Sequence, residues 1–275
     1  MDVQGKAAVV TGGGSGLGAA TARLLASKGA KVAVLDVNED GIKAVAGEIG
    51  GLAIKCDVTD EASVRSALET AKAAHGAARI VVNCAGVATG ERIVGREGPS
   101  DLARFRKVIE INLIGSYSVL NLAANDMAKE EPVTEDGERG VIINTASVAA
   151  FDGQIGQGAY SASKGGIAGL TLPAARELAK FGVRVVTIAP GLLETPMLTS
   201  MPPQVYESLV ATTLFPKRLG KPEEYAALAA HICENSLING ETIRLDGSGH
   251  RITSSVACRT QHRTAERVMQ HRCAF

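Results

Sequence analysis

A tyrosine and a lysine spaced four residues apart, Tyr160 and Lys164, form a pair that could move a proton. They open a long Ala/Leu-rich segment that is typical of a helix, where residues i and i+4 share one face. A phenol with a pKa of about 10 needs that value lowered by roughly 3 units to act as a base near neutral pH. A neighbouring ammonium supplies part of that shift. The same spacing is common on solvated helix faces, so the pair needs support from its surroundings.

Ser147 lies 13 residues before Tyr160 (160 − 147) and directly follows an apolar run, Val141–Ala146. Its hydroxyl could hold a substrate oxygen by hydrogen bonding while the phenol transfers the proton. The alternative is a loop serine that caps backbone N–H groups. Ser147 has no G-x-S-x-G elbow and no evident histidine partner, so hydrolysis by a serine nucleophile is excluded as the expected chemistry.

A glycine-rich loop, Thr11–Gly18, follows the first apolar run and precedes a helix-like stretch. Glycines let backbone N–H groups approach a pyrophosphate, and the N-terminus of a helix favours its negative charge. Outside this strand, turn and helix setting the pattern would indicate only a turn. The loop predicts dinucleotide binding through Gly12, Ser15, Gly16, Leu17 and Gly18.

Asp36 ends the second apolar run, 20 residues after Gly16 (36 − 16), which suits a carboxylate bound to an adenosine ribose. A 2′-phosphate would meet that negative charge with no compensating arginine at Ser15, Val37 or Asn38. The expected cofactor is therefore NAD rather than NADP. The alternative reading of Asp36 is a cap of the turn before the next helix.

The elements that must position these residues are seven short apolar runs alternating with helix-like segments. Both faces of each run are apolar, which predicts a parallel sheet covered by helices on both faces. We expect an α/β chain with a single-domain, Rossmann-type, doubly wound parallel sheet, whose carboxyl edge collects the candidate residues. The runs are Ala7–Val10, Lys31–Leu35, Leu52–Lys55, Ile80–Val82, Val141–Asn144, Val183–Ile188 and Thr242–Leu245.

The composition fits one soluble globular domain. Hydrophobic residues make up 45% of the 275 residues, and Lys plus Arg equal Asp plus Glu at 29 each, so neither nucleic acid nor an anionic membrane is an expected partner. The N-terminus reaches the glycine loop after too few apolar residues for a signal peptide, and no run of transmembrane length follows. Five scattered cysteines suit reduced thiols. The expected location is cytoplasmic.

Together these motifs resemble the short-chain dehydrogenase/reductase superfamily over roughly residues 5–251. The resemblance implies a catalytic tetrad of Asn112, Ser147, Tyr160 and Lys164, with Asn112 at a helix irregularity and in a proton relay through Lys164. Cys84 departs from the family's more usual asparagine. Beyond the glycine loop and Asp36, the resemblance implies cofactor contacts by Asp57, Val58, Asn83, Ala85, Gly86, Tyr160, Lys164, Pro190 and Gly191. In the segment that follows, Thr195 could bond the nicotinamide amide, and the alternative is a surface threonine.

Within the superfamily, the stretch from Gly140 to Leu198 and the segment NGETIRLDG resemble the type 2 3-hydroxyacyl-CoA dehydrogenases. This implies oxidation of (S)-3-hydroxyacyl-CoA by NAD⁺, a step of fatty acid metabolism, with short or branched chains favoured. Gln154 and Gln157, together with Ser147 and Tyr160, would contact substrate. The apolar segment of about residues 191–215 suggests a lid. Rival functions are a 3-oxoacyl-carrier-protein, other ketone or hydroxysteroid reductase, and a non-catalytic NAD-binding scaffold.

Two further expectations concern assembly and the C-terminus. Pro173 lies inside the predicted helix after Lys164 and should kink it or cost about 3 kcal/mol. In the family this helix packs against a partner subunit, so a homotetramer is expected, with close approach at Gly165, Gly166, Ala168 and Gly169. We divide the chain into a domain of residues 1–251 and a basic extension of residues 252–275. The spacing of Cys258, His262, His271 and Cys273 fits no standard zinc site, so no metal is expected.

Overall fold

The computed structural model describes residues 1–96, 98–195, 209–210 and 213–249. The extension of residues 252–275 and most of the proposed lid lie outside these described residues. A seven-stranded sheet with the order β3-β2-β1-β4-β7-β8-β9 forms the centre, and all of its neighbouring strands are parallel. Its strands are β1 (Ala7–Thr11), β2 (Lys31–Asp36), β3 (Leu52–Lys55), β4 (Ile80–Asn83), β7 (Gly140–Thr145), β8 (Val183–Pro190) and β9 (Thr242–Leu245).

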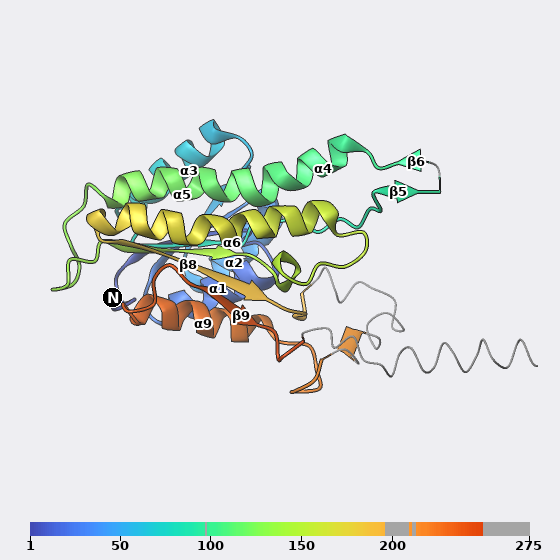
Figure 1. Ribbon diagram of the computed structural model, residues 1–275. Helices are drawn as coiled ribbons and strands as arrows, with labels where there is room; N and C mark the ends of the chain where they lie inside the picture. Colours follow the sequence, from blue (N-terminus) through green and yellow to red (C-terminus); the bar gives the residue numbers. More distant parts are fainter. Residues whose placement is uncertain (97, 196–208, 211–212, 250–275) are drawn as a thin grey trace, which may run out of the picture.

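Helices cover both faces of this sheet, which confirms the expected fold class (Figure 1). One core cluster joins one face to α1 (Gly16–Ser27), α2 (Glu39–Ile49) and α9 (Pro222–Glu234). The other joins the opposite face to α3 (Glu61–His75), α5 (Gly115–Met127) and α6 (Gly158–Leu178). Every residue of β1, β4, β7 and β8 is buried, which accounts for the apolar character of both their faces.

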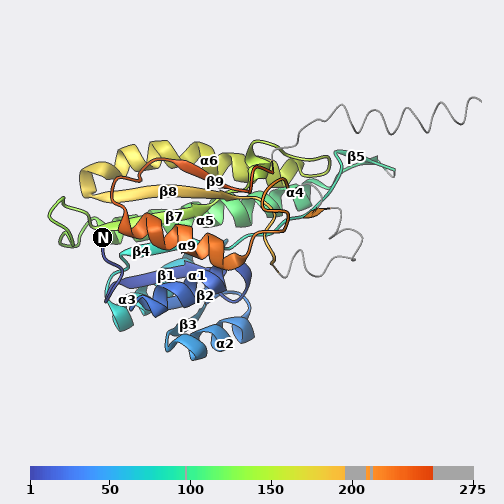
Figure 2. The same cartoon turned by 90° about the horizontal axis from the view of Figure 1, so that it is seen from below.

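The strand order reverses between β1 and β4, and Figure 2 shows the sheet fanning from β3 to β9. Register aligns Thr11 with Asn83 and Asn83 with Asn144, so these strands end at the same level. In a doubly wound sheet the crevice beyond such a reversal is the ligand site. The loops after β1, β2, β3, β4, β7 and β8 therefore share one edge.

The helix that carries Asn112 is irregular, as the family resemblance implies. A π-helical segment, Glu110–Ile114, lies between α4 (Leu102–Ile109) and α5. The short inserted stretch before α4 forms two antiparallel strands, β5 (Val94–Gly95) and β6 (Gly98–Pro99), which the sequence pattern did not predict.

Pro173 lies inside α6, and the helix continues beyond it to Leu178. Its side chain is exposed, so the ring meets solvent rather than the core. The lost backbone hydrogen bond is therefore tolerated within one continuous helix.

Arg184 joins β8 to α9 through a buried charged group. Its guanidinium donates to Glu138 Oε1 at 2.9 Å and to the carbonyl oxygens of Ile232 and Ile238 at 2.8 Å each. Because both partners of the ion pair are buried, the carbonyls are needed to satisfy the remaining guanidinium protons. Among the described helices, none combines the length and apolar composition that crossing a bilayer requires.

Candidate active site

The glycine loop brings the ends of β1 and β4 into direct contact. Gly12 has a φ of +63°, and a Cβ atom on it would lie 2.6 Å from the backbone nitrogen of Ala85. Only glycine fits both the conformation and the space. Thr11 Oγ1 accepts a hydrogen bond from Ala85 N at 3.2 Å, and α1 begins at Gly16. The loop backbone and this helix N-terminus form a cradle suited to a pyrophosphate.

Asp36 stands at the outer end of the same cradle. Its carboxylate accepts hydrogen bonds from Gly14 N at 3.2 Å and from Asn38 N at 3.1 Å. The cap of α2 is Asn38, whose side chain accepts from Gly41 N, so Asp36 is not itself the helix cap. A half-buried carboxylate held by the glycine loop fits a ribose with free hydroxyls and repels a 2′-phosphate.

Residues after β3 and β4 line the next part of the edge. Asp57 is exposed and accepts from Thr59 N and Thr59 Oγ1, whereas Val58 is buried against the start of α5 at Gly115. Asn83 is buried and donates to Asn144 Oδ1 at 2.9 Å. These contacts fix the backbone at the carboxyl ends of β3 and β4.

Asn112 holds the π-helical segment against the loop after β4. Its Nδ2 donates to Val87 O at 2.9 Å and to Ser163 Oγ at 3.0 Å, and its Oδ1 accepts from Val87 N at 2.8 Å. A Cβ on Gly86 would lie 3.2 Å from Asn112 Oδ1 and 3.6 Å from Lys164 Nζ. A side chain on Gly86 would therefore crowd both Asn112 and Lys164.

Lys164 is buried on α6 and donates to the carbonyl oxygen of Thr145 at 2.7 Å. Burial lowers the pKa of its ammonium to about 8. Its Nζ lies 5.8 Å from the centroid of the Tyr160 ring. The lysine therefore lies beneath the tyrosine, as the spacing on one helix face predicts.

Tyr160 is half buried, and burial raises the pKa of its phenol, which a hydrogen bond with Ser147 partly opposes. From sequence, Lys164 was expected to lower the pKa of Tyr160. The direction differs because burial of the phenol, which disfavours the charged phenolate, outweighs the hydrogen bond with Ser147. Ser147 also caps a short 3₁₀ turn by accepting from Ala149 N at 3.1 Å, so the capping alternative and the site position both apply.

The remaining expected residues differ in their burial and in their hydrogen bonds. Gln154 is exposed, and Gln157 accepts from Gln154 N at 2.9 Å, which shapes their loop between Ser147 and α6. Pro190 is the buried last residue of β8. Gly191 N donates to Leu245 O at 2.9 Å, and Thr195 is half buried.

Sequence reasoning missed several buried polar residues around the lysine. Thr145 supplies its acceptor, Ser163 bonds Asn112, and Tyr225 on α9 bonds the Thr145 hydroxyl at 2.7 Å. A polar residue ending an apolar strand was a usable signal for Thr145. No such signal in the sequence pointed to Tyr225, because it lies 80 residues away from Thr145.

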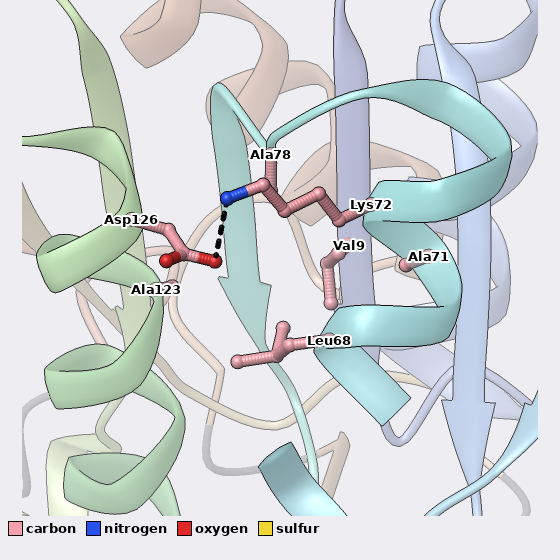
Figure 3. A pocket seen from close by; sticks show the side chains of 7 residues that line it. All are labelled: Val9, Leu68, Ala71, Lys72, Ala78, Ala123 and Asp126. Carbon is pink, nitrogen blue, oxygen red and sulfur yellow. Dashed lines mark ion pairs between the residues drawn. The ribbon is translucent and has the colours of Figure 1, made fainter. Parts of the chain in front are cut away.

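A hollow of about 10 Å³ between α3 and α5 lies apart from these residues (Figure 3). It is lined by alanines and aliphatic side chains, with an ion pair of 3.4 Å between Lys72 and Asp126 at its mouth. A volume of this size holds about one water molecule, so it is no ligand site. The described part of the chain contains no group of three His, Cys, Asp or Glu residues arranged for a metal ion.

A family model described as short chain dehydrogenase matches residues 6–205 of the sequence. The chain belongs to the short chain dehydrogenase family. The match covers the glycine loop, Asn112, Ser147, Tyr160 and Lys164, so family membership and the geometry concern the same edge of the sheet. The resemblance stated from the motifs is confirmed.

Similar members of the family are known. The human protein named 3-hydroxyacyl-CoA dehydrogenase type-2 is 50% identical over 250 residues, 90% of this chain and 95% of the human one. The structure of the Mycobacterium avium protein of that name has a TM-score of 0.85 and 43% identity, covering 91% of this chain and 98% of that one. A 3-ketoacyl-(acyl-carrier-protein) reductase from Brucella melitensis, complexed with NADH, has a TM-score of 0.80 and 32% identity, covering 90% and 100%.

Proposed function

We propose that this protein is an NAD-dependent oxidoreductase that converts (S)-3-hydroxyacyl-CoA to 3-oxoacyl-CoA with short or branched acyl chains. The observation that carries the proposal is the group of Ser147, Tyr160 and Lys164 at the carboxyl edge, in a chain 50% identical to the human 3-hydroxyacyl-CoA dehydrogenase type-2 over 90% of its length. The balanced reaction is 3-hydroxyacyl-CoA plus NAD⁺ to 3-oxoacyl-CoA, NADH and H⁺.

Tyr160 acts as the acid/base in this proposal. Its phenolate takes the proton from the substrate hydroxyl, while Ser147 donates a hydrogen bond to the substrate oxygen. Lys164 stabilises the phenolate with its ammonium, and Asn112 keeps the π-helical segment in register beside it. When bound, NAD⁺ supplies the hydride acceptor for the carbinol carbon.

The residues of the cradle suit that dinucleotide. The backbone of Gly12 to Gly18 meets the pyrophosphate, and Asp36 accepts from the adenosine ribose hydroxyls. Asp57, Val58, Asn83, Ala85, Gly86, Pro190 and Gly191 would hold the rest of the dinucleotide. Thr195 would bond the nicotinamide amide. The close contact of Gly12 with Ala85 supports this assignment, because it places the glycine loop directly beside the loop after β4.

The deciding experiment is NADH-coupled reduction of acetoacetyl-CoA, repeated with longer, branched and carrier-protein thioesters and with steroid ketones. The proposal expects the highest kcat/KM for a short or branched acyl-CoA. Preference for an acyl-carrier-protein thioester or a steroid would overturn the substrate assignment while leaving the chemistry of Tyr160 intact.

A ketone or 3-oxoacyl-carrier-protein reductase is the second candidate, and one observation favours it. The Brucella melitensis reductase, similar to this chain, is complexed with NADH. Asp36 therefore selects the cofactor without separating the two reactions, and the higher identity to the human dehydrogenase favours acyl-CoA. A non-catalytic scaffold would have no use for Ser147, Tyr160 and Lys164 together.

The protein is further proposed to be a cytoplasmic homotetramer. Exposed apolar side chains along α4, the π-helical segment, α5 and α6 support assembly, since such faces usually meet a partner. They are Leu102, Phe105, Ile114, Tyr117 and Leu172. Sedimentation velocity tests the assembly, and a monomer at micromolar concentration would refute it. Fractionation of the source cells tests the location.

A further inference from the structure

A chain of buried hydroxyl groups connects α9 to the end of β7 behind Lys164. Tyr225 is fully buried, and its hydroxyl oxygen lies 2.7 Å from Thr145 Oγ1. The Thr145 hydroxyl donates to the carbonyl oxygen of Asn83 at 2.6 Å. Thr145 also offers its own carbonyl oxygen to Lys164 at 2.7 Å. A single residue, Thr145, therefore connects Tyr225 with the ammonium of Lys164.

The direction of these hydrogen bonds follows from proton counting. A threonine hydroxyl has one proton, and the carbonyl of Asn83 can only accept, so that proton is committed to Asn83. Tyr225 must then donate to Thr145, and the Cys84 thiol, 3.7 Å away, donates to the Tyr225 oxygen. Burial raises the pKa of both Tyr225 and Cys84, which keeps both protonated as donors.

We propose that Tyr225 is a positioning residue for Lys164, acting through Thr145. Thr145 ends β7, and beyond it Ala146 N pairs with Ile188 O of β8 at 2.8 Å. The side-chain hydroxyl ties the same residue to β4 and α9. Loss of the Tyr225 hydroxyl leaves the buried Thr145 oxygen without its donor, and the bond to Asn83 alone then holds that side chain, so the Thr145 carbonyl holds the ammonium less firmly.

This role also explains the cysteine found where the family more usually has asparagine. Cys84 Sγ lies 3.7 Å from both Tyr225 Oη and Thr145 Oγ1, so the side chain fills the gap beside the hydroxyl pair. A thiol is small and a weak donor, and it does not compete for the proton that Tyr225 gives to Thr145. Cys84→Ala should therefore change kcat much less than Tyr225→Phe.

The test compares Tyr225→Phe with Thr187→Val. The control removes an equally buried hydroxyl, paired with Thr171 at 2.6 Å and unconnected to Lys164 in the described contacts. Around Lys164 the described structure has two titratable side chains, Tyr160 on α6 and Cys84 after β4, with Tyr225 behind them. Lysine ε-carbon NMR, assigned with Lys164→Met, gives the Lys164 pKa without substrate.

Tyr225→Phe should lower the Lys164 pKa and reduce kcat roughly 3- to 10-fold with little change in KM. Thr187→Val should lower the melting temperature without changing either quantity. Equal effects of the two variants on the Lys164 pKa would overturn the proposal.

A double-mutant cycle tests the path through Thr145. In a Thr145→Val background, Tyr225→Phe should cause no further change in the Lys164 pKa, because the acceptor of its proton is gone. A full additional change would overturn the path. The inference rests on the proposed function, which assigns Lys164 to the catalytic site. The NMR titration of Lys164 does not require turnover. A wild-type protein inactive on every substrate would count against the proposed function alone.

Discussion

Arg244, at the end of β9, donates to the carboxylate of Asp152 at 2.5 Å, although 92 residues separate them in sequence. The guanidinium also bonds Asp246 at 2.9 Å and lies 5.5 Å from the centroid of the Phe151 ring. Asp152 belongs to the loop that carries Gln154 and Gln157 between Ser147 and α6. One strand end thus anchors the loop proposed to meet the acyl group.

Arg244→Met should release that loop. We expect KM for the acyl substrate to rise roughly 3- to 10-fold while kcat and NADH affinity change little, because the acid/base residues stay in place. Steady-state kinetics with a short acyl-CoA measures both. Arg23→Met, which breaks an exposed ion pair with Glu48, is the matched control. A fall in kcat at unchanged KM would contradict the assignment.

Tyr160→Phe should reduce turnover by roughly 10²- to 10⁴-fold, since it removes the group proposed to exchange the proton. NADH affinity should be unchanged, because the cradle around Gly12 and Asp36 is untouched. Stopped-flow or steady-state rates and fluorescence titration of NADH measure the two effects. An active variant would refute the role of Tyr160.

The two reaction directions should respond oppositely to pH. Burial raises the pKa of Tyr160, so the phenol needed for ketone reduction predominates at neutral pH, and the phenolate needed for oxidation increases as pH rises. We expect kcat for oxidation to increase with pH and kcat for reduction to decrease at high pH. Profiles measured in both directions at saturating substrate test this. An oxidation rate independent of pH would count against it.

Lys164→Met should inactivate the protein yet stabilise it at pH 7. The folded pKa of about 8 lies below the unfolded value of 10.5, so burial of the ammonium costs stability on the order of 3 kcal/mol below pH 8. Between these values the unfolded chain binds more protons, and wild-type stability rises with pH. At pH 7 the melting temperature of the variant should exceed that of the wild type, and this difference should narrow above pH 8. A constant difference in melting temperature from pH 7 to 9.5 would contradict this account.

Asp36→Asn should weaken the preference for NAD over NADP. The amide keeps an acceptor for Gly14 N but removes the charge that repels a 2′-phosphate. We expect the kcat/KM ratio of the two cofactors to shift roughly tenfold or more toward NADP. Wild-type protein that prefers NADP would overturn the role of Asp36 at once.

The sequence predicted all seven strands of the main sheet but ended several of them early. Thr11, Asp36, Asn83 and Thr145 are polar, yet each continues its strand because the backbone ladder, not the side chain, sets the end. The motif spacing likewise predicted that Ser147, Tyr160 and Lys164 lie at one edge of the sheet. The contact of Tyr225 with Thr145 was beyond reach, because it depends on how α9 packs against the sheet. The raised pKa of Tyr160 needed the burial of its ring, which no spacing records.

The π-helical segment at Glu110–Ile114 has a consequence for how the long helix around it can change. A π turn holds an extra residue, so α4 and α5 are offset in phase along one continuous rod. That offset lets α4 pack on α6 while α5 packs on α3. Deleting one residue there would turn α4 by about 100° relative to α5 and bring buried Val108 toward solvent. The extra residue thus sets the angle between the packing face of α4 and the packing face of α5. Once that residue is deleted, no single substitution can restore the angle.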